Sequence, residues 1–187
     1  MSYDLRLCLP QPGRSPEEIA TSDEADFIIS DPIPELEVRK QRVATALLQS
    51  NPELTPFNFD FEELARIDQI TVAEAKSKYR HIELNTPEGS GGIQITIYDT
   101  EASVTVPYWH HGAAARHNFQ EIWNYLQILE REGNYFTYDP QLERVLNLNT
   151  DFDSVLKIYE GVSNQFGNPA QLATRRWWQI WKYPANR

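Results

Sequence analysis

Three histidines, His110, His111 and His117, fall within eight positions of the chain. Imidazole nitrogens are common zinc ligands, and a catalytic zinc takes three protein ligands in a tetrahedral arrangement with one open position. Adjacent histidines on an extended segment point to opposite faces, so His110 and His111 make a poor chelating pair. The only cysteine, Cys8, is remote. We therefore interpret the group as a polar turn before a helix, and keep as an alternative a metal-dependent hydrolase that uses the three histidines with an acid such as Asp139.

Paired carboxylates and a glycine-rich run are the other patterns of catalytic type. Adjacent acids such as Glu62 and Glu63 can act as general acid and base only where two unlike environments meet in a cleft, and solvated helix starts give the same pattern. A phosphate-binding loop leads into a helix and carries a lysine, whereas a strand is expected after the Gly-Ser-Gly-Gly run at 89–92. The sequence therefore predicts no catalytic residue, no metal site and no cofactor.

A basic, tryptophan-rich segment ends the chain. Residues 161–187 contain four bases and no acid, so residues 1–160 hold all 27 acids and only 13 of the 17 bases, which gives the body a formal charge of −14 and the tail +4. Arg175, Arg176 and Trp178 belong to this segment, and cations beside aromatic rings suit single-stranded nucleic acid. We favour a basic helix over residues 168–187 that docks on the acidic body, and keep nucleic-acid binding through the tail as an alternative.

The strands that must position these residues follow from a hydrophobic period of two. Apolar and polar side chains alternate over His81–Asn85, Ile93–Ile97 and Val104–Tyr108, and the turn signals between them predict a three-stranded antiparallel meander. The same alternation over Tyr3–Leu9 predicts a strand at the N-terminus.

The pattern changes to helical spacing directly after the meander. Between Ala113 and Arg131, large apolar residues recur every three or four positions, namely Phe119, Ile122, Trp123, Leu126 and Leu129. Gly133-Asn134 ends this helix, and extended runs follow at 135–138 and 145–148. A helix with such an apolar face needs a sheet to cover. The sequence therefore predicts an α+β fold, an antiparallel sheet (the meander plus N-terminal and post-helix strands) with helices packed on one face.

Shorter elements complete one domain over residues 1–187. Ser15-Pro16-Glu17-Glu18 is typical of a helix start, and a helix is expected to begin there and to be short. Helical spacing also spans residues 36–48 and 151–162. The segment 51–60 is predicted to be a loop anchored by aromatic residues, and residues 61–78 fit either two short helices or one irregular connection.

Composition limits the classes of function. The formal net charge is −10, which disfavours binding of nucleic acid over the surface as a whole and favours a basic protein partner. A single cysteine suits a reducing compartment. No apolar run reaches the roughly 20 residues that cross a bilayer, and the N-terminus has no signal-peptide pattern. We expect a cytoplasmic protein without membrane contact, and the sequence leaves its oligomeric state open.

Three short motifs carry a resemblance: Met1-Ser2-Tyr3-Asp4-Leu5, the turn Pro12-Gly13, and Tyr138-Asp139-Pro140-Gln141 after the long helix. Together they resemble a set of small, acidic bacterial proteins, some of which are similar to immunity proteins of polymorphic toxin systems. The resemblance covers only the first strand and the segment near residue 140. It implies a non-enzymatic binder of a toxin domain in the cytoplasm, and it carries over no contact residue.

The resulting hypothesis is a protein-binding module, an immunity-like inhibitor whose acidic surface covers a basic active site. The acid-rich stretches 17–31 and 52–68 would steer the partner and form the rim of the contact. Exposed aromatic side chains would be the anchors. The candidate binding residues are Tyr98, Tyr108, Trp109, His110, His111, Arg175, Arg176 and Trp178.

Overall fold

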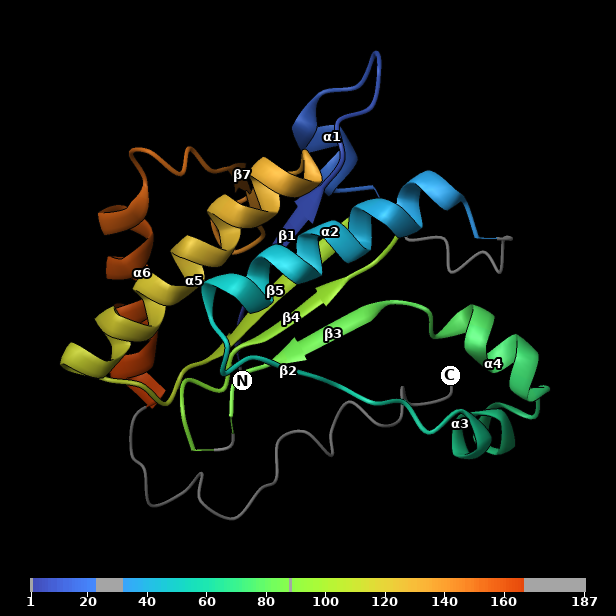
Figure 1. The fold of residues 1–187 in the computed structure, drawn as a ribbon. Coiled ribbons are helices and arrows are strands. Elements are labelled where there is room, and N and C mark those ends of the chain that lie inside the picture. The colour runs from blue at the N-terminus through green and yellow to red at the C-terminus, as the bar shows by residue number, and fades with distance from the viewer. Residues whose placement is uncertain (1, 23–31, 88, 167–187) are drawn as a thin grey trace.

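The computed structural model describes residues 2–22, 32–87 and 89–166, and these form one seven-stranded sheet (Figure 1). All the strand pairs are antiparallel, and the order across the sheet is β2-β3-β4-β5-β1-β6-β7. The strands are β1 (Ser2–Cys8), β2 (Thr55–Pro56), β3 (Ile82–Asn85), β4 (Gln94–Ile97), β5 (Glu101–Pro107), β6 (Phe136–Asp139) and β7 (Arg144–Val145).

The predicted meander is confirmed as β3, β4 and β5, which are successive neighbours. The N-terminal strand β1 lies on its far side, between β5 and the post-helix strand β6. Side chains alternate between the two faces, so Leu5, Val104 and Ile95 meet in register on the core face and are almost fully buried. The other face of the central strands carries polar side chains such as Gln94 and Ser103, which are half-buried.

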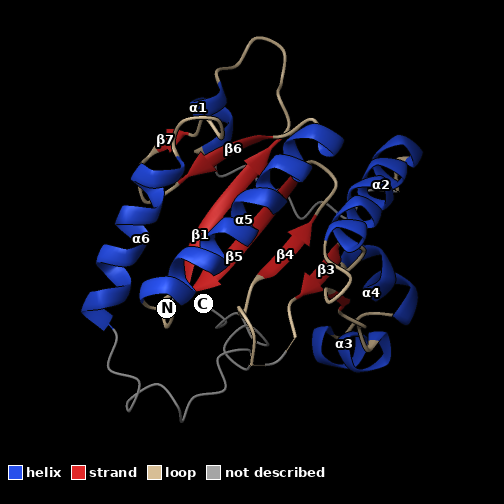
Figure 2. Ribbon diagram, turned by 60° about the vertical axis from the view of Figure 1, so that its left-hand side comes forward, coloured by secondary structure: helices blue, strands red, loops and turns tan. Residues whose placement is uncertain are grey.

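Two long helices cover the core face, and a third lies beside them. They are α2 (Pro34–Ser50), α5 (Gly112–Gly133) and α6 (Phe152–Phe166). Figures 1 and 2 show α5 lying along the sheet with α2 on one side of it and α6 on the other. The predicted apolar face of α5 is buried, from Phe119 to Leu129, and the left-handed Asn134 ends the helix. The α+β class is therefore confirmed.

One short helix, α1 (Pro16–Ala20), lies on the opposite face of the sheet. Ser15 forms a capping box with Glu18 at its start, as the Ser-Pro-Glu-Glu pattern indicates. Ile19 and Ala20 pack on Cys8 and Tyr138, which point away from the main core. The expectation that helices share one face therefore holds for α2 and α5, and α1 departs from it because Cys8 and Tyr138 give the second face a small apolar area of its own.

The uncertain segment 61–78 forms two short helices, α3 (Phe61–Asp68) and α4 (Val72–Lys78). Side-chain caps at Asp60 and Thr71 start them, and the left-handed Gln69 separates them. The pair lies beside the start of β3, away from α5 and α6 (Figures 1 and 2). None of the described helices combines the length and apolar composition that a membrane-spanning helix needs.

Candidate protein-binding surface

The three neighbouring histidines do not converge. His110 places Nε2 2.7 Å from the carbonyl oxygen of Gly91 in the turn between β3 and β4. His111 is the N-cap residue of α5 but makes no side-chain cap bond, and His117 is exposed on that helix. Within the described ranges, no three histidine, cysteine or acidic side chains are grouped so that they could hold a metal ion. The geometry therefore gives the metal-dependent alternative no support.

Trp109 and His110 instead hold the turn between β3 and β4 against the start of α5. Gly92 has φ +65°, and a Cβ atom at this position would lie 2.7 Å from the Trp109 ring. Burial lowers the pKa of His110, which the hydrogen bond to Gly91 only partly offsets, so its ring is neutral near pH 7. Trp109 remains 37% exposed.

Tyr108 is not an exposed anchor, contrary to the sequence-based expectation. It is 7% exposed, and its ring stacks on Tyr159 of α6 at 5.6 Å between ring centroids. Burial raises the pKa of its hydroxyl to about 12. The alternation that places Val104 and Val106 on the core face places Tyr108 there too, so the strand pattern already contained this information.

Arg175, Arg176 and Trp178 lie outside the described residues, as does the whole predicted helix 168–187.

Tyr98 belongs to a larger group of rings, which we call the aromatic patch. It lies at the β2, β3 and β4 side of the sheet next to α3 and α4. Its members are Phe57, Phe59, Phe61, Tyr79, His81 and Tyr98.

The rings of the aromatic patch form a continuous chain. Phe59 is central, with centroid distances of 5.0 Å to Phe57 and 4.8 Å to His81, both edge to face. His81 continues to Tyr98 at 5.1 Å. Phe57 is 47% exposed, which is unusual for a phenylalanine, and the other members are half-buried. The patch is thus a surface with one open end at Phe57.

The faces of the strands explain why these rings meet. Ile82 and Ile97 pair on the core face, so the preceding His81 and the following Tyr98 point to the polar face of the sheet. After β2, the backbone N–H of Phe57 donates to the carbonyl oxygen of Glu83 at 2.8 Å, which extends the edge pairing by one residue. The neighbouring strands β2, β3 and β4 are thus each flanked by an aromatic residue whose ring lies on the polar face of the sheet.

Burial keeps His81 uncharged. It lowers the pKa of His81 to about 4, and the nearby Lys40 ammonium acts in the same direction. Burial, followed by the carboxylates of Glu101 and Glu83, raises the pKa of Tyr98. The aromatic patch thus contains no cation of its own among its members near pH 7, and carboxylates lie close to one end of it.

Carboxylates also stand beside members of the aromatic patch along the chain and on β3. We call Asp60, Glu62, Glu63 and Glu83 the carboxylate rim; the first three are exposed. Between Glu53 and Glu63 the chain has four acids and no base. The negative charge of the rim is partly neutralised within the chain, since Glu63 pairs with Arg66 at 2.5 Å.

Cations of the chain already sit over two of the rings. The ammonium groups of Lys76 and Lys78 lie 6.0 Å and 5.3 Å from the ring centroids of Phe61 and Tyr79.

A buried ion pair fixes the strand ends that carry His81 and Tyr98. Lys40 of α2 is fully buried, and its ammonium lies 2.7 Å from Asp99 Oδ1 and 3.2 Å from the carbonyl oxygen of Arg80. Arg80 also donates to the Asp99 carboxylate. Burial raises the pKa of Asp99, but hydrogen bonds from Arg80 and Lys40 outweigh it and hold the pKa below its usual value. The ion pair therefore ties α2 to the residue before His81 and to the residue after Tyr98.

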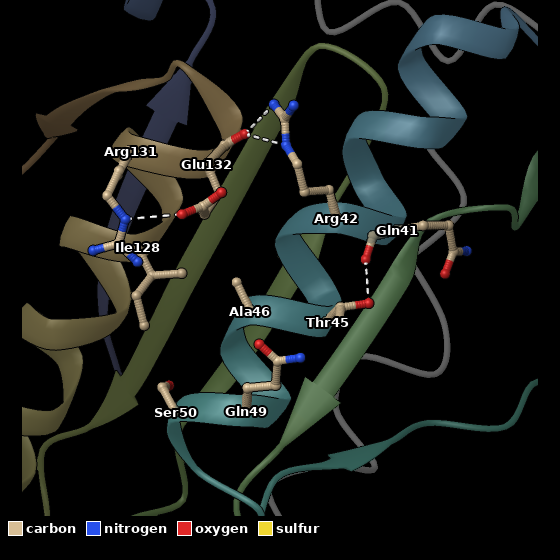
Figure 3. A pocket seen from close by; sticks show the side chains of 9 residues that line it. All are labelled: Gln41, Arg42, Thr45, Ala46, Gln49, Ser50, Ile128, Arg131 and Glu132. Atoms are coloured by element: carbon tan, nitrogen blue, oxygen red, sulfur yellow. Dashed lines mark hydrogen bonds and ion pairs between the residues drawn. The ribbon is translucent and has the colours of Figure 1, made fainter.

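A groove of about 610 Å³ lies elsewhere, between α2 and α5 (Figure 3). Arg42 donates through Nε to the carbonyl oxygen of Glu132 at 3.0 Å, and Arg131 donates to the Glu132 side chain at 2.8 Å. Arg42 thereby pairs with a carbonyl at the C-terminal end of α5, where a cation is favoured. Figure 3 shows both arginines turned toward Glu132. These contacts connect α2 to the C-terminal end of α5.

Sequence reasoning missed most of the aromatic patch. The sequence predicts a loop anchored by aromatic residues over 51–60, although phenylalanines alternate with polar residues over 57–61, Phe-Asn-Phe-Asp-Phe. Such alternation predicts rings on one side of an extended segment. Their meeting with Tyr79 depends on the α3 and α4 pair, which the sequence did not fix.

Comparison with known proteins adds no relative. No protein-family model matches the chain, and no match is found among curated proteins or solved structures.

Proposed function

We propose that this protein is a non-enzymatic binding module that takes a basic protein partner on the aromatic patch and carboxylate rim. The observation that carries the proposal is the chain of six contacting rings with Phe57 47% exposed at its open end. Large aromatic side chains that pass from half-exposed to buried are the usual centres of binding energy in protein interfaces.

Charge supports a basic partner. The formal net charge of −10 favours approach of a cationic surface, and the carboxylate rim would orient it. His81 and Tyr98 are themselves uncharged near pH 7, so these two rings add no charge that would repel a cationic partner. Arginine and lysine side chains can stack on such rings while their cationic ends meet carboxylates.

The finer form of the proposal is an immunity-like inhibitor of a basic toxin domain in the cytoplasm. It is supported by the resemblance of the chain's opening residues and of Tyr138-Asp139-Pro140-Gln141 to immunity-like proteins, together with the acidic charge. An inhibitor of this kind acts by covering an active site, and it needs a rigid contact surface and no catalytic group.

The test compares two serine substitutions at exposed apolar positions. A partner captured from the source organism at low salt is titrated against the unchanged chain, Phe57→Ser, and the control Val38→Ser, whose side chain is 67% exposed on α2. Loss of an interface anchor costs about 2 kcal/mol, so Phe57→Ser is expected to weaken binding about 30-fold. Val38→Ser should change the affinity less than about threefold.

Salt provides the second readout. Raising the ionic strength should slow association of the partner with the unchanged chain, because steering by surface carboxylates is screened. Equal affinity of Phe57→Ser and the unchanged chain, or the absence of any captured partner at low salt, would contradict the proposal. Salt-sensitive binding of single-stranded nucleic acid, with no protein captured, would favour the nucleic-acid alternative.

A further inference from the structure

We propose that the aromatic patch has an occupant within the same chain, namely the basic C-terminal segment 167–187, and that a protein partner must displace it. The inference rests on the proposed function of the patch and adds its regulation. It follows from three observations: complementary charge, complementary side-chain chemistry, and the position where the described chain ends.

The first observation is charge. Residues 167–187 contain Arg175, Arg176, Lys182 and Arg187 and no acid. Phe57, the open end of the aromatic patch, belongs to an acidic stretch of the chain, which has four acids and no base between Glu53 and Glu63. At physiological ionic strength such charges interact mainly within about 8 Å, so the attraction favours direct docking.

The second observation is chemistry. The C-terminal segment places Trp177, Trp178 and Trp181 among its arginines and lysine. The patch already accepts cations over its rings, as Lys78 over Tyr79 at 5.3 Å demonstrates. The C-terminal segment and the aromatic patch can therefore form both cation–π contacts and ring–ring contacts. This is also the chemistry proposed for the external partner, so the two ligands would compete.

The third observation is reach. Tyr159 of α6 donates to the carbonyl oxygen of Pro107 at 2.6 Å, which places α6 against the end of β5 where β1 begins. Tyr98 lies at the other end of β4 and β5, about 20 Å away along the seven residues of β5. The 21 residues after Phe166 span up to about 70 Å when extended. This length exceeds the roughly 20 Å along β5 together with the roughly 15 Å across the three strand spacings from β5 to β2.

The test is photo-crosslinking in the full chain without any partner. Phe57→p-benzoylphenylalanine is irradiated, and the crosslinked peptides are identified by mass spectrometry. Asn58, which is exposed next to Phe57, is a second attachment point in case the first substitution disturbs the patch. Val38 on α2 is the control position, because it is 67% exposed outside the patch.

Crosslinks from positions 57 and 58 are expected within residues 167–187, at least tenfold above those from position 38. The variant R175Q/R176Q/K182Q/R187Q should reduce them about tenfold, whereas replacing the same arginines with lysine should largely retain them. A yield from positions 57 and 58 equal to that from position 38 would overturn the inference. So would crosslinks formed only between ¹⁴N- and ¹⁵N-labelled copies, which would make a second copy the occupant.

The two proposals fail separately. If the partner's affinity depends on Phe57 but the C-terminal segment never crosslinks to the patch, the proposed function stands and the occupant is wrong. If the segment crosslinks as expected but no protein partner is captured, the C-terminal segment is the occupant of the patch and the proposed function is wrong. If both proposals hold, the variant R175Q/R176Q/K182Q/R187Q should bind the partner about tenfold more tightly than the unchanged chain, because its C-terminal segment no longer competes for the patch.

Discussion

Lys40→Met tests the buried support beneath the aromatic patch. The ammonium of Lys40 is fully buried and lies 2.7 Å from Asp99 Oδ1, 2.9 Å from Glu37 Oε1 and 3.2 Å from the carbonyl oxygen of Arg80. Methionine fills nearly the same volume but leaves two carboxylates without this partner. Removing one member of a buried pair costs about 3–5 kcal/mol.

The lower end of that range applies here. Asp99 keeps its pairing with Arg80, and its side chain is 21% exposed, so water can partly solvate it. We therefore expect a loss of about 3 kcal/mol in the free energy of unfolding, and a fall in Tm of about 6 to 12 °C for a chain of this size. The measurement is urea-induced unfolding followed by tryptophan fluorescence. Lys157→Met, at an exposed lysine on α6, is the control and should change the free energy by less than about 0.5 kcal/mol.

A double substitution separates charge from packing. Asp99→Asn removes the charge of one of the two carboxylates that Lys40→Met leaves without this partner, so the two changes together should cost at least about 1 kcal/mol less than the sum of the two single changes. A Lys40→Met variant as stable as the Lys157→Met control would refute the reasoning. Strict additivity of the two changes would instead show that Lys40 and Asp99 have no energetic coupling.

Two further substitutions address the β3–β4 turn and the aromatic patch. Gly92→Ala should destabilise the chain by more than about 1 kcal/mol, because φ is +65° and the new Cβ would lie 2.7 Å from the Trp109 ring. Thermal unfolding measures the change. An unchanged Tm would contradict the packing of Trp109 against this turn. The pKa of His81 is about 4 in the folded chain and about 6.5 when exposed, so between these values the unfolded chain binds a proton that the folded chain does not. The free energy of unfolding should therefore fall by about 3 kcal/mol as the pH drops from 6.5 to 4. His81→Phe should remove this part of the pH dependence. If the free energy of unfolding of the two proteins changes in parallel with pH, His81 is not buried as described.

The sequence predicted those parts of the fold that depend on local periodicity. Alternation located β1, β3, β4 and β5, and the 3.6-residue spacing located α5, because each pattern follows from which side of an element meets the core. β2 was missed, since two residues that include Pro56 give no periodic signal. The packing of α1 on the second face was also missed, because it depends on the pairing of β1 with β6, which joins residues far apart in the chain, such as Cys8 and Phe136.

The candidate site was predicted less well, for a physical reason. A binding surface is a set of side chains that converge from distant segments, and a sequence supplies residue types without their convergence. His110, His111 and His117 are close in sequence but do not form one group in space. His81, which the sequence analysis places only at the start of a strand, contacts the rings of Phe59, Tyr79 and Tyr98. Tyr98 was the one predicted anchor that belongs to the aromatic patch.

The described sheet is bounded by strands of only two residues, β2 with its Pro56 at one edge and β7 (Arg144–Val145) at the other. A long, flat border would offer unpaired backbone N–H and C=O groups to any extended polypeptide, including copies of itself during synthesis at high concentration. Borders this short offer almost no template for such addition. The chain can therefore keep aromatic rings near one border without inviting fibril-like growth from it, and whatever associates there must be recognised by its side chains and not by backbone pairing.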